Sequence, residues 1–127
     1  MKRYECIPRL EALGITFDHA VQLRRIAMQL HRWHEKECGI NDGCIERDET
    51  TQKTYWLNSQ TMRRTPIPDN ETAAKKRLAK VMKNYPTLTP YIQGDPRGAA
   101  LYILKPGDVP EGENVDSYYS RGVAVYQ

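Results

Sequence analysis

The chain has 127 residues, of which 39% are apolar and 28% charged, and its formal net charge is +3. This length predicts one α+β domain spanning residues 1–127, and the composition excludes an intrinsically disordered chain. No apolar run approaches the roughly 18 residues of a membrane-spanning helix, so we expect no membrane partner.

The three cysteines, Cys6, Cys38 and Cys44, are an odd number in a chain without a recognisable signal peptide. The first residues are basic, but no apolar run follows them. Free thiols in a reducing compartment are the expectation, and the cytoplasm is the predicted location.

The first predicted element is a long helix from about Phe17 to Cys38. Thr16 is suited to cap it, and Asp18 complements the helix dipole in the first turn. Its apolar residues recur at helical spacing and predict one buried stripe: Leu23, Ile26, Ala27, Leu30 and Trp33. A short helical turn is expected before it, over Pro8–Leu13.

The middle of the chain predicts a hairpin followed by a second helix. Residues 44–47 and 54–57 alternate in polarity and flank a polar loop, whereas Ser59–Pro68 reads as irregular because of its prolines. Asp69 is placed to cap a helix that ends before Pro86. The residues predicted to form its buried stripe are Ala74, Leu78, Val81 and Tyr85.

The last third predicts strands at Tyr91–Gln93, 99–104 and 123–126, with a tight turn at Asp95–Gly98. A helical turn is expected near Val115–Tyr119. We detect no internal repeat. The order of elements predicts an α+β fold, with two main helices packed on one face of a small antiparallel sheet.

Three segments carry a resemblance to known sequences: residues 91–103, the run 106–110 and Tyr118–Gly122. Together with 25–35 and the hairpin, they resemble a family of small uncharacterised bacteriophage and prophage proteins. The resemblance implies a phage-encoded accessory protein acting in the bacterial cytoplasm, and it transfers no catalytic residue.

Metal binding is one hypothesis for the end of the first helix. His31, His34 and Cys38 lie there at spacings that imidazole and thiolate ligands can use for zinc, and Cys44 is a further candidate. The order of residues matches no established zinc motif, and a hydrogen-bonded histidine on a packed helix explains His34 equally well.

Charge is distributed unevenly along the chain. The acids gather in 107–117, whereas the bases gather upstream, and this polarity favours an oriented encounter with a charged macromolecule. The residues predicted to bind the partner are these basic side chains and two tyrosines: Arg63, Arg64, Lys75, Lys76, Lys80, Tyr118 and Tyr119. A merely solvated surface is the competing interpretation.

The leading functional hypothesis is a non-enzymatic protein that binds a host protein or nucleoprotein complex, such as a defence complex. We expect no cofactor and identify no catalytic set. The first alternative is a direct nucleic-acid-binding module, for which the arginine-bearing helix after Leu13–Thr16 also resembles a helix-turn-helix. The second alternative is a metal-dependent enzyme built on His31, His34 and Cys38.

Overall fold

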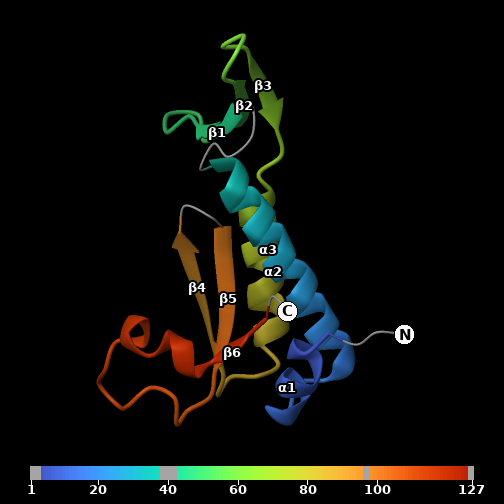
Figure 1. Ribbon diagram of the computed structural model, residues 1–127, viewed down its shortest axis with the longest axis vertical. Helices are drawn as coiled ribbons and strands as arrows, with labels where there is room; N and C mark the ends of the chain where they lie inside the picture. Colours follow the sequence, from blue (N-terminus) through green and yellow to red (C-terminus); the bar gives the residue numbers. More distant parts are fainter. Residues whose placement is uncertain (1–3, 38–42, 96–97, 126–127) are drawn as a thin grey trace.

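The structure is a computed structural model that describes residues 4–37, 43–95 and 98–125. Its helices are α1 (Cys6–Ala12), α2 (Phe17–Glu37) and α3 (Asn70–Met82). The strands are β1 (Gly43–Arg47), β2 (Thr54–Asn58), β3 (Arg64–Ile67), β4 (Thr89–Asp95), β5 (Gly98–Leu104) and β6 (Val123–Ala124). Two 3₁₀ turns, η1 (Val115–Ser117) and η2 (Tyr119–Arg121), precede β6. The α+β class is confirmed (Figure 1).

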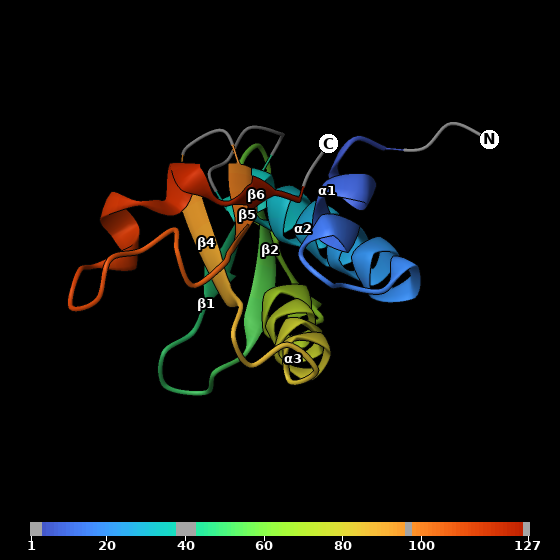
Figure 2. The same cartoon turned by 90° about the horizontal axis from the view of Figure 1, so that it is seen from below.

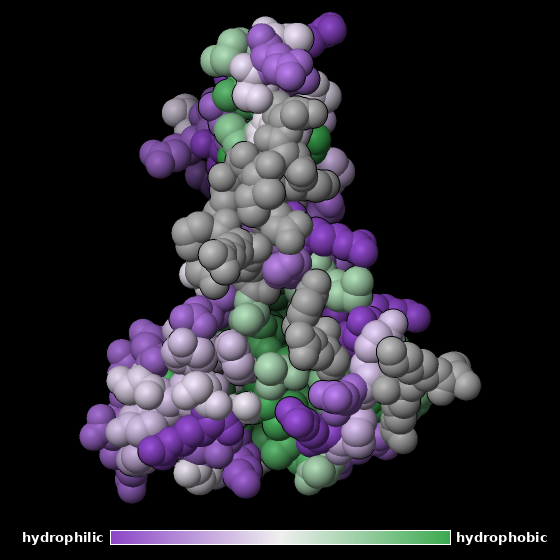
Figure 3. All heavy atoms as spheres, in the orientation of Figure 1, coloured by the Kyte–Doolittle hydropathy of each residue, from purple (hydrophilic) through white to green (hydrophobic). Residues whose placement is uncertain are grey.

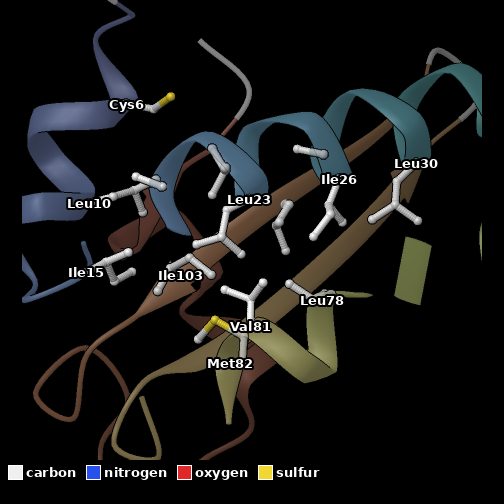
Figure 4. Packing of buried hydrophobic residues seen from close by; sticks show 14 of the residues in the cluster. Cys6, Leu10, Ile15, Leu23, Ile26, Leu30, Leu78, Val81, Met82 and Ile103 are labelled. Atoms are coloured by element: carbon white, nitrogen blue, oxygen red, sulfur yellow. The ribbon is translucent and has the colours of Figure 1, made fainter. Parts of the chain in front are cut away.

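The core lies between α2, α3 and β5. The apolar stripe of α2 includes Leu23, Ile26 and Leu30, which face Leu78 from α3 and Ile103 from β5 (Figure 4). These side chains are all buried, because the 3.6-residue period places them on one side of the helix. The stripe predicted from the sequence is therefore confirmed, and α1 packs against the start of the same helix.

The strands form two antiparallel sheets, ordered β1-β2-β3 (sheet A) and β4-β5-β6 (sheet B). This differs from the single sheet expected from the sequence. Helices α2 and α3 cover one face of sheet B, and the segment carrying η1 and η2 lies toward the other (Figure 2). Leu104 alternates with the core residue Ile103 and is buried beneath that C-terminal segment.

Sheet A forms an arm beyond the end of α2, and the space-filling view shows the molecule narrowing there (Figure 3). None of the buried apolar residues comes from Gly43–Ile67, in which only Gly43 and Thr54 are buried. An ion pair of 2.5 Å between Arg47 and Asp69 joins this sheet to the start of α3.

The interpretation of Ser59–Pro68 as irregular was wrong, because it contains strand β3. Pro66 pairs with Tyr55 in the register of β2 and β3. A proline is tolerated there because β3 is an edge strand, where an amide directed away from the sheet is not needed for pairing.

The two loops of sheet A have the same geometry, a local repeat that the sequence analysis missed. In each loop, an Asp or Asn side chain accepts hydrogen bonds from the amides two and three residues later, at 2.9–3.2 Å. The residue four positions later has a φ of 60° at Gln52 and 59° at Met62. At the end of each loop, a threonine hydroxyl accepts a hydrogen bond from the amide two residues later, which belongs to Lys53 in one loop and Arg63 in the other. Asp48–Lys53 and Asn58–Arg63 are therefore two copies of one turn.

Other boundaries agree closely with expectation. Asp69 caps α3 by accepting from the Thr72 amide, as predicted, although the helix ends at Met82 rather than near Pro86. β6 pairs with β5 as expected but is described only over Val123–Ala124. Within the described ranges, no helix combines the length and apolar character needed to cross a membrane.

Candidate functional site

The outward face of α3 carries a line of lysines that ends at Lys83, the C-cap residue of the helix. Lys76, Lys80 and Lys83 are exposed and follow one another at i, i+4 and i+7, so they lie on one side of the helix. The rise of about 1.5 Å per residue separates neighbouring members by roughly 4.5–6 Å along the axis. None of the three forms an ion pair with another described residue. We call these residues the α3 lysine stripe.

The other cations of α3 are engaged. Lys75 donates to Glu71 at 3.1 Å, an i, i+4 ion pair along the helix. Arg77 reaches Gln29 on α2 through its guanidinium and also contacts the Ala73 carbonyl oxygen at 3.4 Å. Of the residues predicted to bind a partner, Lys76 and Lys80 therefore have available ammonium groups, whereas Lys75 is exposed but paired.

Arg63 and Arg64 do not continue this stripe. They lie at the end of β3 that is remote from α3 (Figure 1). Arg64 forms an ion pair of 3.2 Å with Glu46 and stacks 4.4 Å above the ring of Tyr55. Strand β3 thus separates two cationic regions that the sequence places close together.

The two adjacent tyrosines have different environments. Tyr119 packs on sheet B, where its ring stacks on Tyr91 at 5.4 Å and meets Tyr102 edge-on at 5.2 Å. Its hydroxyl accepts a hydrogen bond of 3.0 Å from Gln93. Such contacts fix the C-terminal segment on the sheet and give Tyr119 a packing role.

Tyr118, like Tyr119, is half-buried. The guanidinium of Arg121 lies 4.7 Å from its ring centroid, within the range of a cation–π interaction. Arg121 is exposed, and the hydroxyl of Tyr118 has no hydrogen-bond partner among the described residues, in contrast to that of Tyr119.

The acidic residues of 107–117 lie on the side of sheet B away from α3, as Figure 2 shows for the segment that carries them. Glu111, Glu113 and Asp116 are exposed. A hydrogen bond to Asp116 is the main cause that raises the pKa of Tyr91, because the phenol donates while it is protonated. Sheet B thus separates the acidic segment from the α3 lysine stripe.

The predicted metal ligands are only partly described. His31 and His34 lie on α2, and the ring of His34 packs against the backbone of Gly94 on β4. Cys38 lies outside the described residues. Within the described part of the chain, no three His, Cys, Asp or Glu side chains gather as a metal site.

The helix-turn-helix alternative depends on three arginines of α2. Arg25 and Arg32 are exposed, whereas Arg24 is engaged. The guanidinium of Arg24 lies 3.3 Å from the ring centroid of Tyr4 and donates to the sulfur of Met28. These contacts hold it against the N-terminal segment.

No protein-family model, curated protein or solved structure matches the chain. The resemblance to small bacteriophage proteins therefore rests on the residues quoted for it alone.

Lys83 was missing from the predicted partner-binding residues, although its position could have been found from sequence. Lys83 follows Lys76 by seven residues, which is close to two helical turns, so the spacing predicts that Lys83 lies on the same side of the helix as Lys76 and Lys80. The engagement of Arg64 and Arg77 had no such local signal, since Glu46 and Gln29 are distant in the chain.

Proposed function

We propose that the protein is a non-enzymatic binding protein whose α3 lysine stripe docks on an acidic surface of a macromolecular partner. The observation that carries the proposal is the alignment of Lys76, Lys80 and Lys83 without counterions among the described residues. Three such charges on a rigid helix favour association with a complementary field while costing little rearrangement.

An acidic protein surface fits better than nucleic acid. Binding of single strands combines cationic and stacking side chains in one groove. Here the tyrosines around Tyr119 contact sheet B on the side away from α3, so they cannot extend the stripe. The acidic residues around Glu111 add repulsion toward a polyanion that would wrap around the molecule.

The resemblance to phage proteins supplies the proposed setting. The partner would be a host complex in the bacterial cytoplasm, and a complex that handles nucleic acid or acts in defence is the leading candidate. The protein would act by occupying an acidic site on that complex, without chemistry of its own.

The test compares two variants of equal net charge. The first replaces Lys76, Lys80 and Lys83 with Gln. The control replaces Lys53, Arg63 and Lys105 with Gln, because these exposed cations lie on other elements. Circular dichroism confirms folding, and each protein is then used to capture partners from bacterial lysate with and without nuclease treatment.

We expect the stripe variant to lose a partner that the wild type and the control retain, and we expect capture to weaken as salt rises. Equal capture by all three proteins contradicts the proposal. Loss of the captured material after nuclease treatment, together with salt-dependent binding of duplex DNA by the purified protein, supports the nucleic-acid alternative instead.

A further inference from the structure

Strand β4 is an open edge of sheet B. The strand order β4-β5-β6 leaves β4 with β5 as its one hydrogen-bonded neighbour among the described residues. Its other contacts are made by side chains: Tyr119 stacks on Tyr91, and the ring of His34 packs against Gly94. Its seven residues are long for an unprotected edge, and Figure 1 shows it as the outermost strand of the sheet.

The direction of the free backbone groups follows from the pairing of β5. The Val125 amide donates to the Leu101 carbonyl at 2.9 Å, so Leu101 directs its backbone groups toward the β6 side. Antiparallel strands alternate this direction at each residue, so Tyr102 directs its groups toward β4 and bonds its partner Tyr91. The next positions on β4 must then point their groups outward.

The outward positions are Pro90, Ile92 and Gly94. Pro90 has no amide hydrogen, and its placement at an outward position agrees with the tolerance of proline at sheet edges. Ile92 and Gly94 each present an N–H and a C=O for which no partner exists among the described residues. The outward backbone groups of β4 are therefore arranged to form hydrogen bonds with a further antiparallel strand.

The usual protections of an edge strand are weak here. Natural edges carry lysines, other charges, bulges or several prolines that oppose pairing with another chain. β4 has the sequence Thr-Pro-Tyr-Ile-Gln-Gly-Asp, which is uncharged up to its last residue. Pro90 is the one blocking residue, and it lies near the start of the strand.

We propose that β4 pairs with β4 of a second copy of this chain, antiparallel and centred on Ile92. In this register the two Ile92 residues exchange N–H to C=O hydrogen bonds in both directions. Gly94 of each copy donates to the Pro90 carbonyl of the other, so the missing proline amide costs little. Two three-stranded sheets become one continuous sheet.

A second copy fits this edge better than an unrelated strand for two reasons. The pairing is self-complementary, as a twofold axis requires, and the uncharged residues Pro90–Gly94 meet no charge repulsion from their own copy. The half-buried Ile92, which packs against the core of its own subunit, gains an apolar neighbour in the other Ile92.

The twofold axis of such a pair is perpendicular to the sheet, so both helix layers lie on the same face. Two α3 lysine stripes would then face the same side and could bind a partner with two acidic sites more tightly than one stripe can. The pairing itself does not depend on the stripe or on any partner.

Sedimentation velocity and light scattering over micromolar to millimolar concentrations test the proposal on the full chain. We expect the mass to double with concentration for the wild type and for Ile92→Val. Ile92→Pro should remain a monomer, because it removes the central outward amide but no hydrogen bond to β5. Added salt and the stripe variant should leave the dimer unchanged, which separates this proposal from the proposed function.

Amide hydrogen exchange of the wild type keeps the test decisive if Ile92→Pro fails to fold. The Ile92 and Gly94 amides should exchange rapidly in dilute protein and become protected as the mass doubles. A wild type that stays monomeric throughout, or a dimer in which these two amides stay unprotected, overturns the proposal.

Discussion

The hydroxyl oxygen of Tyr85 lies 2.6 Å from Nδ1 of His19 and 3.0 Å from the backbone nitrogen of Thr16. The Thr16 amide donates to that oxygen, and the same hydroxyl group forms the hydrogen bond with Nδ1 of His19. The two rings also meet edge-on at 5.5 Å. One side chain after α3 therefore fixes the start of α2, and it satisfies an amide that the helix itself leaves unpaired.

Replacing Tyr85 with Phe should lower the free energy of unfolding by about 1–3 kcal/mol, because the Thr16 amide and His19 lose a common partner. Denaturant unfolding measures the change. Tyr118→Phe is the control, since its hydroxyl has no hydrogen-bond partner among the described residues. A loss no larger than that of the control would mean that the contact adds nothing to stability.

Gly43→Ala should disrupt sheet A. A Cβ on Gly43 would lie 2.2 Å from the Leu57 carbonyl oxygen and 2.6 Å from the ring of Trp56, both on the neighbouring strand. Overpacking of this kind typically costs about 1–3 kcal/mol. Amide spectra should lose the dispersed signals of Gly43–Ile67 while the core signals persist. Gly107→Ala is the control, because its Cβ would meet no atom within 4 Å. It should leave the signals of sheet A and of the core unchanged.

The Asp69 cap should make stability depend on pH. Burial by itself would raise the pKa of Asp69, but hydrogen bonds from Thr72 and the nearby Arg47 outweigh it and hold the pKa below its usual value. The unfolded chain then binds the proton more readily, so the stabilisation is complete above the ordinary pKa of aspartate and is lost as pH falls through the lowered value.

Asp69→Asn tests this dependence, because the amide oxygen can still cap α3 but carries no charge. Urea unfolding across the acidic range should show a smaller loss of stability for Asp69→Asn than for the wild type. Asp69→Ala should cost about 0.5–2 kcal/mol at neutral pH, since the cap itself is removed. Identical pH profiles for wild type and Asp69→Asn would exclude Asp69 as the titrating group.

The thiols should differ in reactivity. Cys6 is 2% exposed, and burial raises the pKa of its thiol despite the nearby Arg24, whereas Cys44 is partly exposed. The thiolate is the reactive form, so a thiol reagent should modify Cys44 in the folded protein and Cys6 only on unfolding. Peptide mass mapping reads each site separately. Equal labelling of both in folded protein would show that α1 opens readily.

The odd number of cysteines, together with the lack of a recognisable signal peptide, predicts that thiol titration of the unfolded, unreduced protein finds all three thiols. Cys6 and Cys44 are free in the structure, in agreement with that expectation, whereas Cys38 lies outside the described residues.

Local patterns were sufficient to predict α2, the cap of α3 and the pairing of β1 with β2. Each depends on residues within a few positions of one another, such as the helical spacing of Leu23 and Leu30 or the cap formed by Asp69 on Thr72. β3 was missed because its residues show no apolar alternation, and Pro66 argues against a strand except at an edge. Only its pairing with β2 reveals it.

The sequence by itself determined which faces of the helices are buried and which lysines of α3 are exposed, because the helical period fixes both. The tertiary structure alone decided which charges remain available, since Arg64 and Arg77 are engaged by residues far along the chain. It also separated the tyrosines from the lysine stripe and left β4 at an edge. These outcomes depend on the free energies of contacts between segments that are distant in the sequence, and local sequence patterns do not predict such contacts.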